Sequence, residues 1–138
     1  MNNVKWFGFF LIIAALTSGC AHLSSEKKYE KLEATQKLFW KSLRWKSYEG
    51  AVRVIRFRNP ARKLASIDNL NRITLTNYEE GASISTGEED VYTTDVIFSY
   101  VQDETGRLLQ VKHKETWWYD KETKNWFLDS DMPDFKFD

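Results

Sequence analysis

The chain has 138 residues with 20 basic and 20 acidic side chains, and aromatic residues make up 15% of it. This charge balance argues against a nucleic-acid-binding protein, which needs a basic surplus to neutralise phosphates. The aromatic content excludes a disordered chain, and the length suits one small domain with a single hydrophobic core.

The N-terminus has the pattern of a secretory signal. Lys5 supplies a positive charge, and residues 6–16 form an uninterrupted apolar run that Thr17 and Ser18 end. Such a run is too short to cross a membrane comfortably. Cys20 follows as the only cysteine, so it has no partner for an internal disulfide and belongs to no Cys cluster of the zinc-binding kind. Residues 1–19 are therefore predicted to be a signal peptide.

Residues 16–20, Leu-Thr-Ser-Gly-Cys, resemble the lipobox of bacterial lipoproteins, with Thr17 in the position that leucine usually occupies. The resemblance implies cleavage before Cys20 and lipid on its thiol. Each buried CH₂ contributes about 0.8 kcal/mol, so two acyl chains anchor a protein stably. The alternative is an uncleaved signal anchor with an incidental cysteine. Ala21 stands where an aspartate commonly retains lipoproteins in the inner membrane, which favours the outer membrane with the domain facing the periplasm.

The residues after the cysteine are predicted to form a short tether, 20–24, and one domain, 25–138. Ser25 before Glu26 is a plausible helix start, and it predicts a helix over about 25–45. Leu38 and Trp45 fall on the outer side of that helix and need a second cover. The inward face is formed by Tyr29, Leu32, Gln36, Phe39, Trp40 and Leu43.

Two further short helices are expected. The first covers about 48–56 and is a candidate cover for Leu38 and Trp45. The second covers about 60–70, because Asn59-Pro60 reads as an N-cap followed by proline at the first helical position. Leu64 and Ile67 of this third helix are expected to point inward.

After residue 71 the apolar spacing changes from helical to alternating, which predicts an antiparallel meander. Strands are expected near 72–79 and over 90–102, 107–119 and 126–129, and Gly106 lies in a turn that needs a positive φ. Helices followed by a meander indicate an α+β fold, with N-terminal helices packed on one face of a curved sheet. The predicted one-face positions are Ile73, Leu75 and Asn77 in the first strand, and Tyr92, Val96, Phe98 and Tyr100 in the second.

Two segments carry a family resemblance. Residues 38–55 (LFWKSLRWKSYEGAVRVI) and 117–135 (WWYDKETKNWFLDSDMPDF) resemble parts of small NTF2-like, or cystatin-like, lipoproteins of Gram-negative bacteria. The resemblance implies a cone that encloses a pocket. That family usually places a strand hairpin between its early helices, and this sequence shows none there. The fold serves catalysis in some proteins and binding or assembly in others, so it does not decide function.

A pocket enzyme of this class would need a base. His113 and Glu115 lie two residues apart on a predicted strand, so they share a face and could act as a base and its orienting group. Asp95 is a second candidate base. The competing interpretation is that Asp95 and the charged segment 112–115 lie on solvated parts of the sheet.

Aromatic residues gather on the first helix and the meander. They are either core residues or the lining of an apolar pocket or partner surface. Neighbouring strand residues point to opposite faces, so either Trp117 or Trp118 lies outside the core that the helices cover. The candidate site residues are Trp40, Tyr100, Trp117, Trp118 and Trp126.

No metal site or cofactor is predicted. The acidic runs 88–90 and 129–131 lack the glycine and the spaced carboxylates of a calcium loop. The preferred hypothesis is a non-enzymatic, lipid-anchored envelope domain that binds an envelope protein or an apolar ligand. The alternatives are a pocket enzyme that uses His113 or Asp95 as its base, and a structural accessory subunit of an envelope complex.

Overall fold

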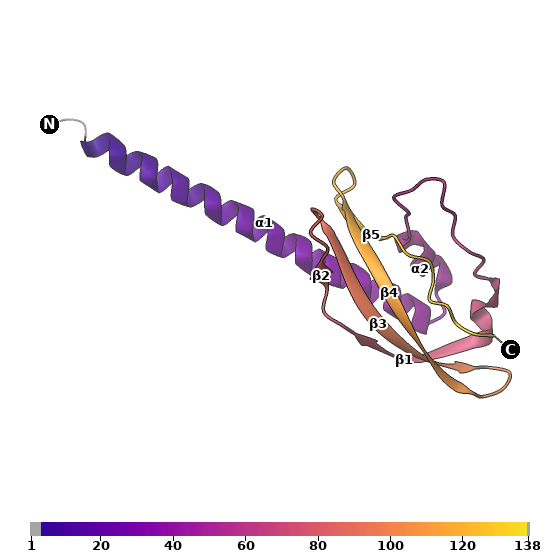
Figure 1. Ribbon diagram of the computed structural model, residues 1–138. Helices are drawn as coiled ribbons and strands as arrows, with labels where there is room; N and C mark the ends of the chain where they lie inside the picture. Colours follow the sequence, from indigo (N-terminus) through magenta and orange to yellow (C-terminus); the bar gives the residue numbers. More distant parts are fainter. Residues whose placement is uncertain (1–3, 138) are drawn as a thin grey trace. The chain divides into compact units, whose positions relative to one another are not determined.

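The computed structural model describes residues 4–137, with side chains described from Ser24 onward. Two compact units are present, one up to Glu33 and one from Ala34. Figure 1 labels helices α1 (Val4–Arg44) and α2 (Tyr48–Val54) and strands β1 (Ile73–Glu80), β2 (Ile84–Ser85), β3 (Val91–Gln102), β4 (Leu108–Asp120) and β5 (Asn125–Leu128). A 3₁₀ helix, η1 (Asp68–Arg72), directly precedes β1.

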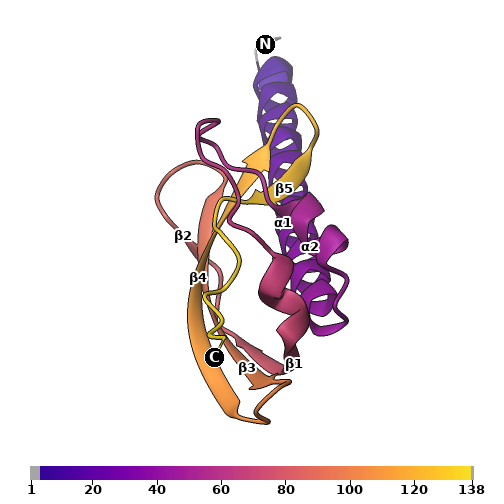
Figure 2. The same ribbon diagram turned by 90° about the vertical axis from the view of Figure 1, so that its right-hand side faces the viewer.

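The second unit is α+β, as predicted. Its antiparallel sheet has the order β1-β3-β4-β5, and β2 pairs with β3. Figure 2 shows the sheet curving strongly, with the end of α1, α2 and η1 on its concave side. The β3–β4 register places His113 opposite Val96 and Glu115 opposite Thr94.

The C-terminal tail, residues 129–137, runs inside the curve of the sheet (Figure 2). Phe135 is buried, and its ring centroid lies 4.9 Å from that of Tyr100 and 6.1 Å from that of Phe98. The backbone N–H of Lys136 donates to the Tyr100 hydroxyl at 2.9 Å, and Gln102 Nε2 donates to the Lys136 carbonyl at 3.2 Å. The tail therefore fills part of the concavity that a cone would leave open.

The predicted start of the first helix, near residue 25, is wrong. Helix α1 begins at Val4, so Ser25 lies inside it and does not cap it. Residues 4–24 contain no proline and are rich in Leu, Ile and Ala, so nothing in this stretch breaks the helix. Cys20 lies on this helical backbone, but its side chain, like those of residues 4–23, is outside the described part of the structure.

The predicted helix over 60–70 is also wrong. Residues 62–67 have no regular secondary structure, and Leu64 and Ile67 are only half-buried. The Asn59 side chain accepts a hydrogen bond from the Ala61 N–H at 3.0 Å, and the Asn59 carbonyl accepts one from Arg62 at 3.1 Å. Asn59-Pro60 therefore closes a tight turn and does not start a helix.

Two smaller expectations fail for local reasons. A β-bulge between Leu75 and Asn77 shifts the register of β1, so Asn77 is exposed and Tyr78 turns toward Trp40, with ring centroids 5.4 Å apart. Helix α2 forms close to its predicted place but does not cover Leu38 and Trp45, which are 56% and 78% exposed. It joins the sheet instead, through a bridge between Ile55 and Leu128.

Candidate functional site

A carboxyl group lies at the centre of the interface between α1 and the sheet. Glu115 of β4 is fully buried, and each of its oxygens accepts an indole N–H, from Trp40 at 2.9 Å and from Trp117 at 2.9 Å. Burial raises the pKa of Glu115 to about 8, although the two indole hydrogen bonds act to lower it. The group can hold a proton near neutral pH, but both of its oxygens are occupied by the core.

A second polar cluster lies beside it. Gln36 of α1 donates through Nε2 to Thr94 Oγ1 at 2.9 Å and to Ser83 Oγ at 3.0 Å. The hydroxyls of Ser83 and Thr94 are 2.8 Å apart. Gln36 and Thr94 are both buried, so the cluster satisfies polar groups inside the interface. The helical spacing placed Gln36 on the inward face, but its partners are more than forty residues away and the sequence did not identify them.

His113 shares the inner face with Glu115, as predicted, but the two do not form a base and its orienting group. Both Glu115 oxygens are bonded to tryptophans, whereas His113 hydrogen-bonds to the backbone of Asp131 in the C-terminal tail. Its Nε2 is buried and has no hydrogen-bond partner among the described residues. Burial lowers the pKa of His113 to about 4, so the ring is neutral at pH 7. The interpretation of segment 112–115 as fully solvated is therefore wrong for His113 and Glu115.

The second candidate base, Asp95, lies on the convex face of the sheet. Its carboxylate is exposed and pairs with Lys112 of the neighbouring strand at 3.1 Å. This placement matches the solvated interpretation, and it separates Asp95 from the buried groups His113 and Glu115.

The five aromatic candidates are not an open surface. Trp40, Tyr100, Trp117 and Trp126 are at most 2% exposed and belong to the core. Trp118 is the one that leaves the opposite face, yet it is half-buried: its Nε1 donates to the Arg56 carbonyl at 2.8 Å and its ring packs on Phe127 at 5.7 Å. The sequence left open which of Trp117 and Trp118 belongs to the core, and the structure shows that it is Trp117.

The larger of two described cavities lies between η1 and the tail. It has a volume of about 300 Å³, and its lining includes Ser66, Asn69, Asp131, Met132 and Phe137. One Asp131 oxygen is buried without a hydrogen-bond partner among the described residues, and the other accepts from Arg62 at 2.9 Å. Neither His113 nor Glu115 lines this cavity, so no shifted acid or base that the structure identifies opens into it.

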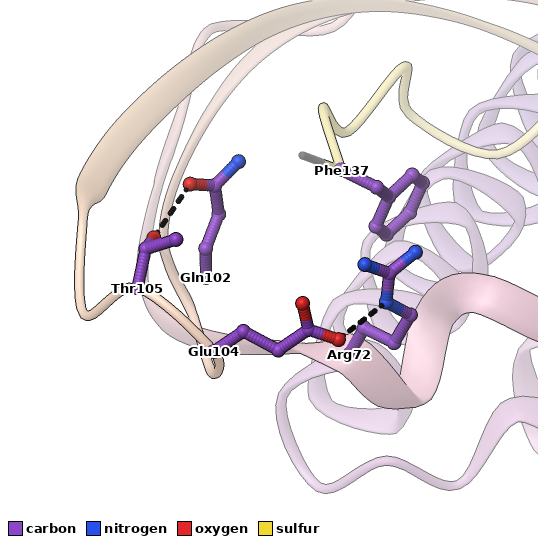
Figure 3. A pocket seen from close by; sticks show the side chains of 5 residues that line it. All are labelled: Arg72, Gln102, Glu104, Thr105 and Phe137. Carbon is purple, nitrogen blue, oxygen red and sulfur yellow. Dashed lines mark hydrogen bonds and ion pairs between the residues drawn. The ribbon is translucent and has the colours of Figure 1, made fainter.

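The smaller cavity, drawn in Figure 3, has a volume of only about 10 Å³. Arg72 donates to Glu104 at 3.1 Å on one side of it, where the Phe137 ring also lies, and Thr105 donates to Gln102 at 2.9 Å on the other side. This volume suits one water molecule and no larger ligand.

The acidic runs are paired with arginines. Arg58 bonds to Asp129 at 2.9 Å and to Glu88 at 2.9 Å, and Arg62 bonds to Asp131. These pairs fasten the irregular segment after α2 to the strand ends. Among the residues that the structure describes, no group of three or more His, Cys, Asp or Glu side chains could hold a metal ion.

Comparison with protein-family models, with characterised proteins and with solved structures gave no match. Within the described residues, no helix is both long enough and apolar enough to span a membrane. The class that the fold defines is thus a small α+β domain whose helices pack on a strongly curved antiparallel sheet.

Proposed function

We propose that this chain is a lipid-anchored cell-envelope protein whose folded domain has a non-enzymatic binding or accessory role. The anchoring part rests on the sequence of residues 1–20: a basic start, a short apolar run and Leu-Thr-Ser-Gly before Cys20. Two or three acyl chains on that cysteine would hold the protein on the outer membrane, with its domain in the periplasm.

The placement of Glu115 carries the non-enzymatic part. A catalytic acid or base must reach a substrate, either directly or through one water molecule. Glu115 has the raised pKa that marks many catalytic carboxyls, but it is fully buried and both of its oxygens bond to tryptophans. A carboxyl group in this position is part of the packed core and cannot contact a substrate.

We further propose that the curved sheet is an NTF2-like cone. The strong curvature and the helices on the concave side support this assignment. The C-terminal tail occupies the place of an open pocket, with Phe135 against Phe98 and Tyr100. A cone closed in this way fits a binding or assembly module better than a pocket enzyme.

Metabolic labelling with a clickable fatty acid tests the anchor. The full chain is expected to take up the label and to fractionate with the outer membrane. Cys20→Ser should lose the label and keep its signal peptide, while Ser24→Ala, a nearby control, should behave as the unaltered chain. Equal labelling of the Cys20→Ser chain would refute the anchor.

A second candidate role is small-ligand binding in the cavity of about 300 Å³, a volume at the lower end for ligand sites. The carboxylate residue Asp131 lines this cavity, which favours a ligand with a hydrogen-bond donor. Anilinonaphthalene sulfonate can serve as a fluorescent probe of the apolar lining. Ala65→Trp should fill the cavity and reduce probe binding without lowering the melting temperature, and unchanged probe fluorescence would argue against this role.

A further inference from the structure

Two large apolar side chains at the C-terminal end of α1 point into solvent, one in the helix and one on the residue that directly follows it. Leu38 is 56% exposed and Trp45 is 78% exposed. They are seven residues apart, so at about 100° per residue they lie within about 20° of each other around the helix. The other large exposed apolar residues among those described, Ile84 and Leu108, lie on separate strands. We call Leu38 and Trp45, with Lys37, Lys41 and Arg44, the Leu38–Trp45 face.

The backbone fixes the position of Trp45. The Ser47 N–H donates to the Ser42 carbonyl at 2.8 Å, and the Lys46 N–H donates to the Leu43 carbonyl at 3.2 Å. Lys46 has a φ of 55°, so these bonds form a Schellman motif in which Trp45 is the C-cap residue. The indole is therefore presented by an ordered helix end.

The charges on this face have one sign. Residues 34–46 contain four basic side chains and no acidic one. Lys46 pairs with Asp103 at 3.0 Å, which leaves Lys37, Lys41 and Arg44 as exposed cations on the helix. By helical geometry all three lie on the same side of the line from Leu38 to Trp45, at about 60–120° from Leu38. The face thus consists of two exposed apolar side chains with three cations along one side of them, which we call its basic flank.

We propose that the Leu38–Trp45 face docks on an anionic phospholipid surface. Tryptophan favours the membrane–water interface, and lysine and arginine beside it are attracted to anionic headgroups. A second copy of the chain is a poorer occupant, because two such faces would bring like charges together. The proposal rests on the lipid anchor proposed above, since Leu38 follows Cys20 by eighteen residues. Even fully extended, a chain of that length spans at most about 65 Å, so the anchor keeps the face near the bilayer.

A fluorescent probe in the full-length, lipidated chain tests the proposal. With Cys20 acylated, Trp45→Cys supplies the only free thiol for an environment-sensitive NBD label, and the chain without this substitution should take up no label. In vesicles that contain phosphatidylglycerol, we expect the NBD emission to shift to the blue and to be quenched by brominated lipids. Leu108→Cys, also at an exposed apolar site, is the matched control and should show neither effect.

The basic flank is tested separately with Lys41→Gln and Arg44→Gln in the labelled chain. Each is expected to weaken docking about fivefold, and 1 M salt should weaken it similarly. An unshifted, unquenched probe at position 45 in a chain that carries the fatty-acid label would overturn the docking proposal and leave the anchor standing. Quenching that is equal on neutral vesicles would also overturn it, because it would show no preference for anionic lipid. A chain without the fatty-acid label whose probe is still quenched would overturn the anchor alone.

Discussion

Trp40 lies on α1 and Trp45 directly follows the last residue of that helix, and the two side chains have opposite environments. Trp40 is 2% exposed and donates its indole N–H to the buried Glu115. Trp45 is 78% exposed, beside cations that have no acidic neighbour within residues 34–46. The indole of Trp40 thus bonds to a buried carboxyl group in the core, whereas the indole of Trp45 lies in solvent.

The two tryptophans therefore differ in what they contribute to folding. The fold needs Trp40, because without it one oxygen of a buried carboxyl would lose its partner. It gains little from Trp45, since an exposed indole adds almost no burial. A large apolar residue held in solvent by an ordered helix cap therefore points to an interaction outside the domain.

The largest expected effect separates the two tryptophans directly. Trp40→Ala should lower the free energy of unfolding by about 3–5 kcal/mol, through the cavity and the lost hydrogen bond to Glu115. Trp45→Ala should change it by less than about 0.5 kcal/mol. Urea denaturation followed by circular dichroism measures both. Comparable losses for the two variants would mean that the exposed face also stabilises the fold.

The buried partner of Trp40 gives the second test, through pH. The pKa of Glu115 is raised to about 8, so the folded state holds a proton that the unfolded chain releases above about pH 4.5. The contribution of Glu115 to the free energy of unfolding is therefore complete below pH 4.5. It is lost as pH rises toward 8, by at most about 1.4 kcal/mol per pH unit. Glu115→Gln should remove this slope.

The contribution of His113 to stability depends on pH in the opposite direction. Its pKa is lowered to about 4, so its contribution is present above pH 6.5 and is lost as pH falls toward 4. The two slopes oppose each other between pH 4.5 and 6.5, and Glu115 acts alone between 6.5 and 8. Melting temperatures across pH 4–8 should therefore fall on the alkaline side in the unaltered chain and in His113→Leu, but not in Glu115→Gln. An alkaline slope that survives Glu115→Gln would assign it to another group.

The sequence predicted the α+β fold because its meander alternates clearly, and it placed β3, β4 and the turn at Gly106 close to their observed positions. It also placed Gln36 and Trp40 on the inward face of the first helix. It could not predict that Glu115 is buried, because a glutamate in the run Lys-His-Lys-Glu has the pattern of a solvated strand. Only the long-range contact with Trp40, seventy-five residues away, shows its burial.

The errors have local causes. A single bulge in β1 moved Asn77 outward, and alternation cannot foresee an extra residue. Asn59-Pro60 is a residue pair that can start either a turn or a helix. Here Arg58 and Arg62 hold the segment to Asp129, and this favours the turn. The helix over 48–56 was expected to cover Leu38 and Trp45. The spacing of apolar residues along one helix does not show which other element packs against it, so this expectation failed.

Two exposed cations, Arg58 and Lys41, are expected to differ in their contribution to stability. Arg58 bonds to Asp129 and Glu88, which raise the pKa of its guanidinium, whereas Lys41 lies on the Leu38–Trp45 face. Arg58→Met should reduce stability by about 1–2 kcal/mol, because it releases the segment after α2 from the strand ends. Lys41→Met should have no measurable effect on unfolding. A loss for Lys41→Met as large as that for Arg58→Met would show that Lys41 has a structural partner.

The smallest expected effect concerns the turn that holds Trp45. Lys46 has a φ of 55°, a conformation that glycine adopts without strain, and its ammonium pairs with the exposed Asp103. Lys46→Gly and Lys46→Ala both remove that ion pair, so the difference between them isolates the backbone. The glycine variant should be more stable than the alanine variant by about 0.5–1 kcal/mol. If the Schellman motif positions the indole, labelled Trp45→Cys should also show a lower NBD anisotropy with Lys46→Ala than with Lys46→Gly, because the strained cap loosens first. Equal anisotropy together with equal stability would mean that the helix end is not held by this motif, and the ordered presentation of Trp45 would then need another cause.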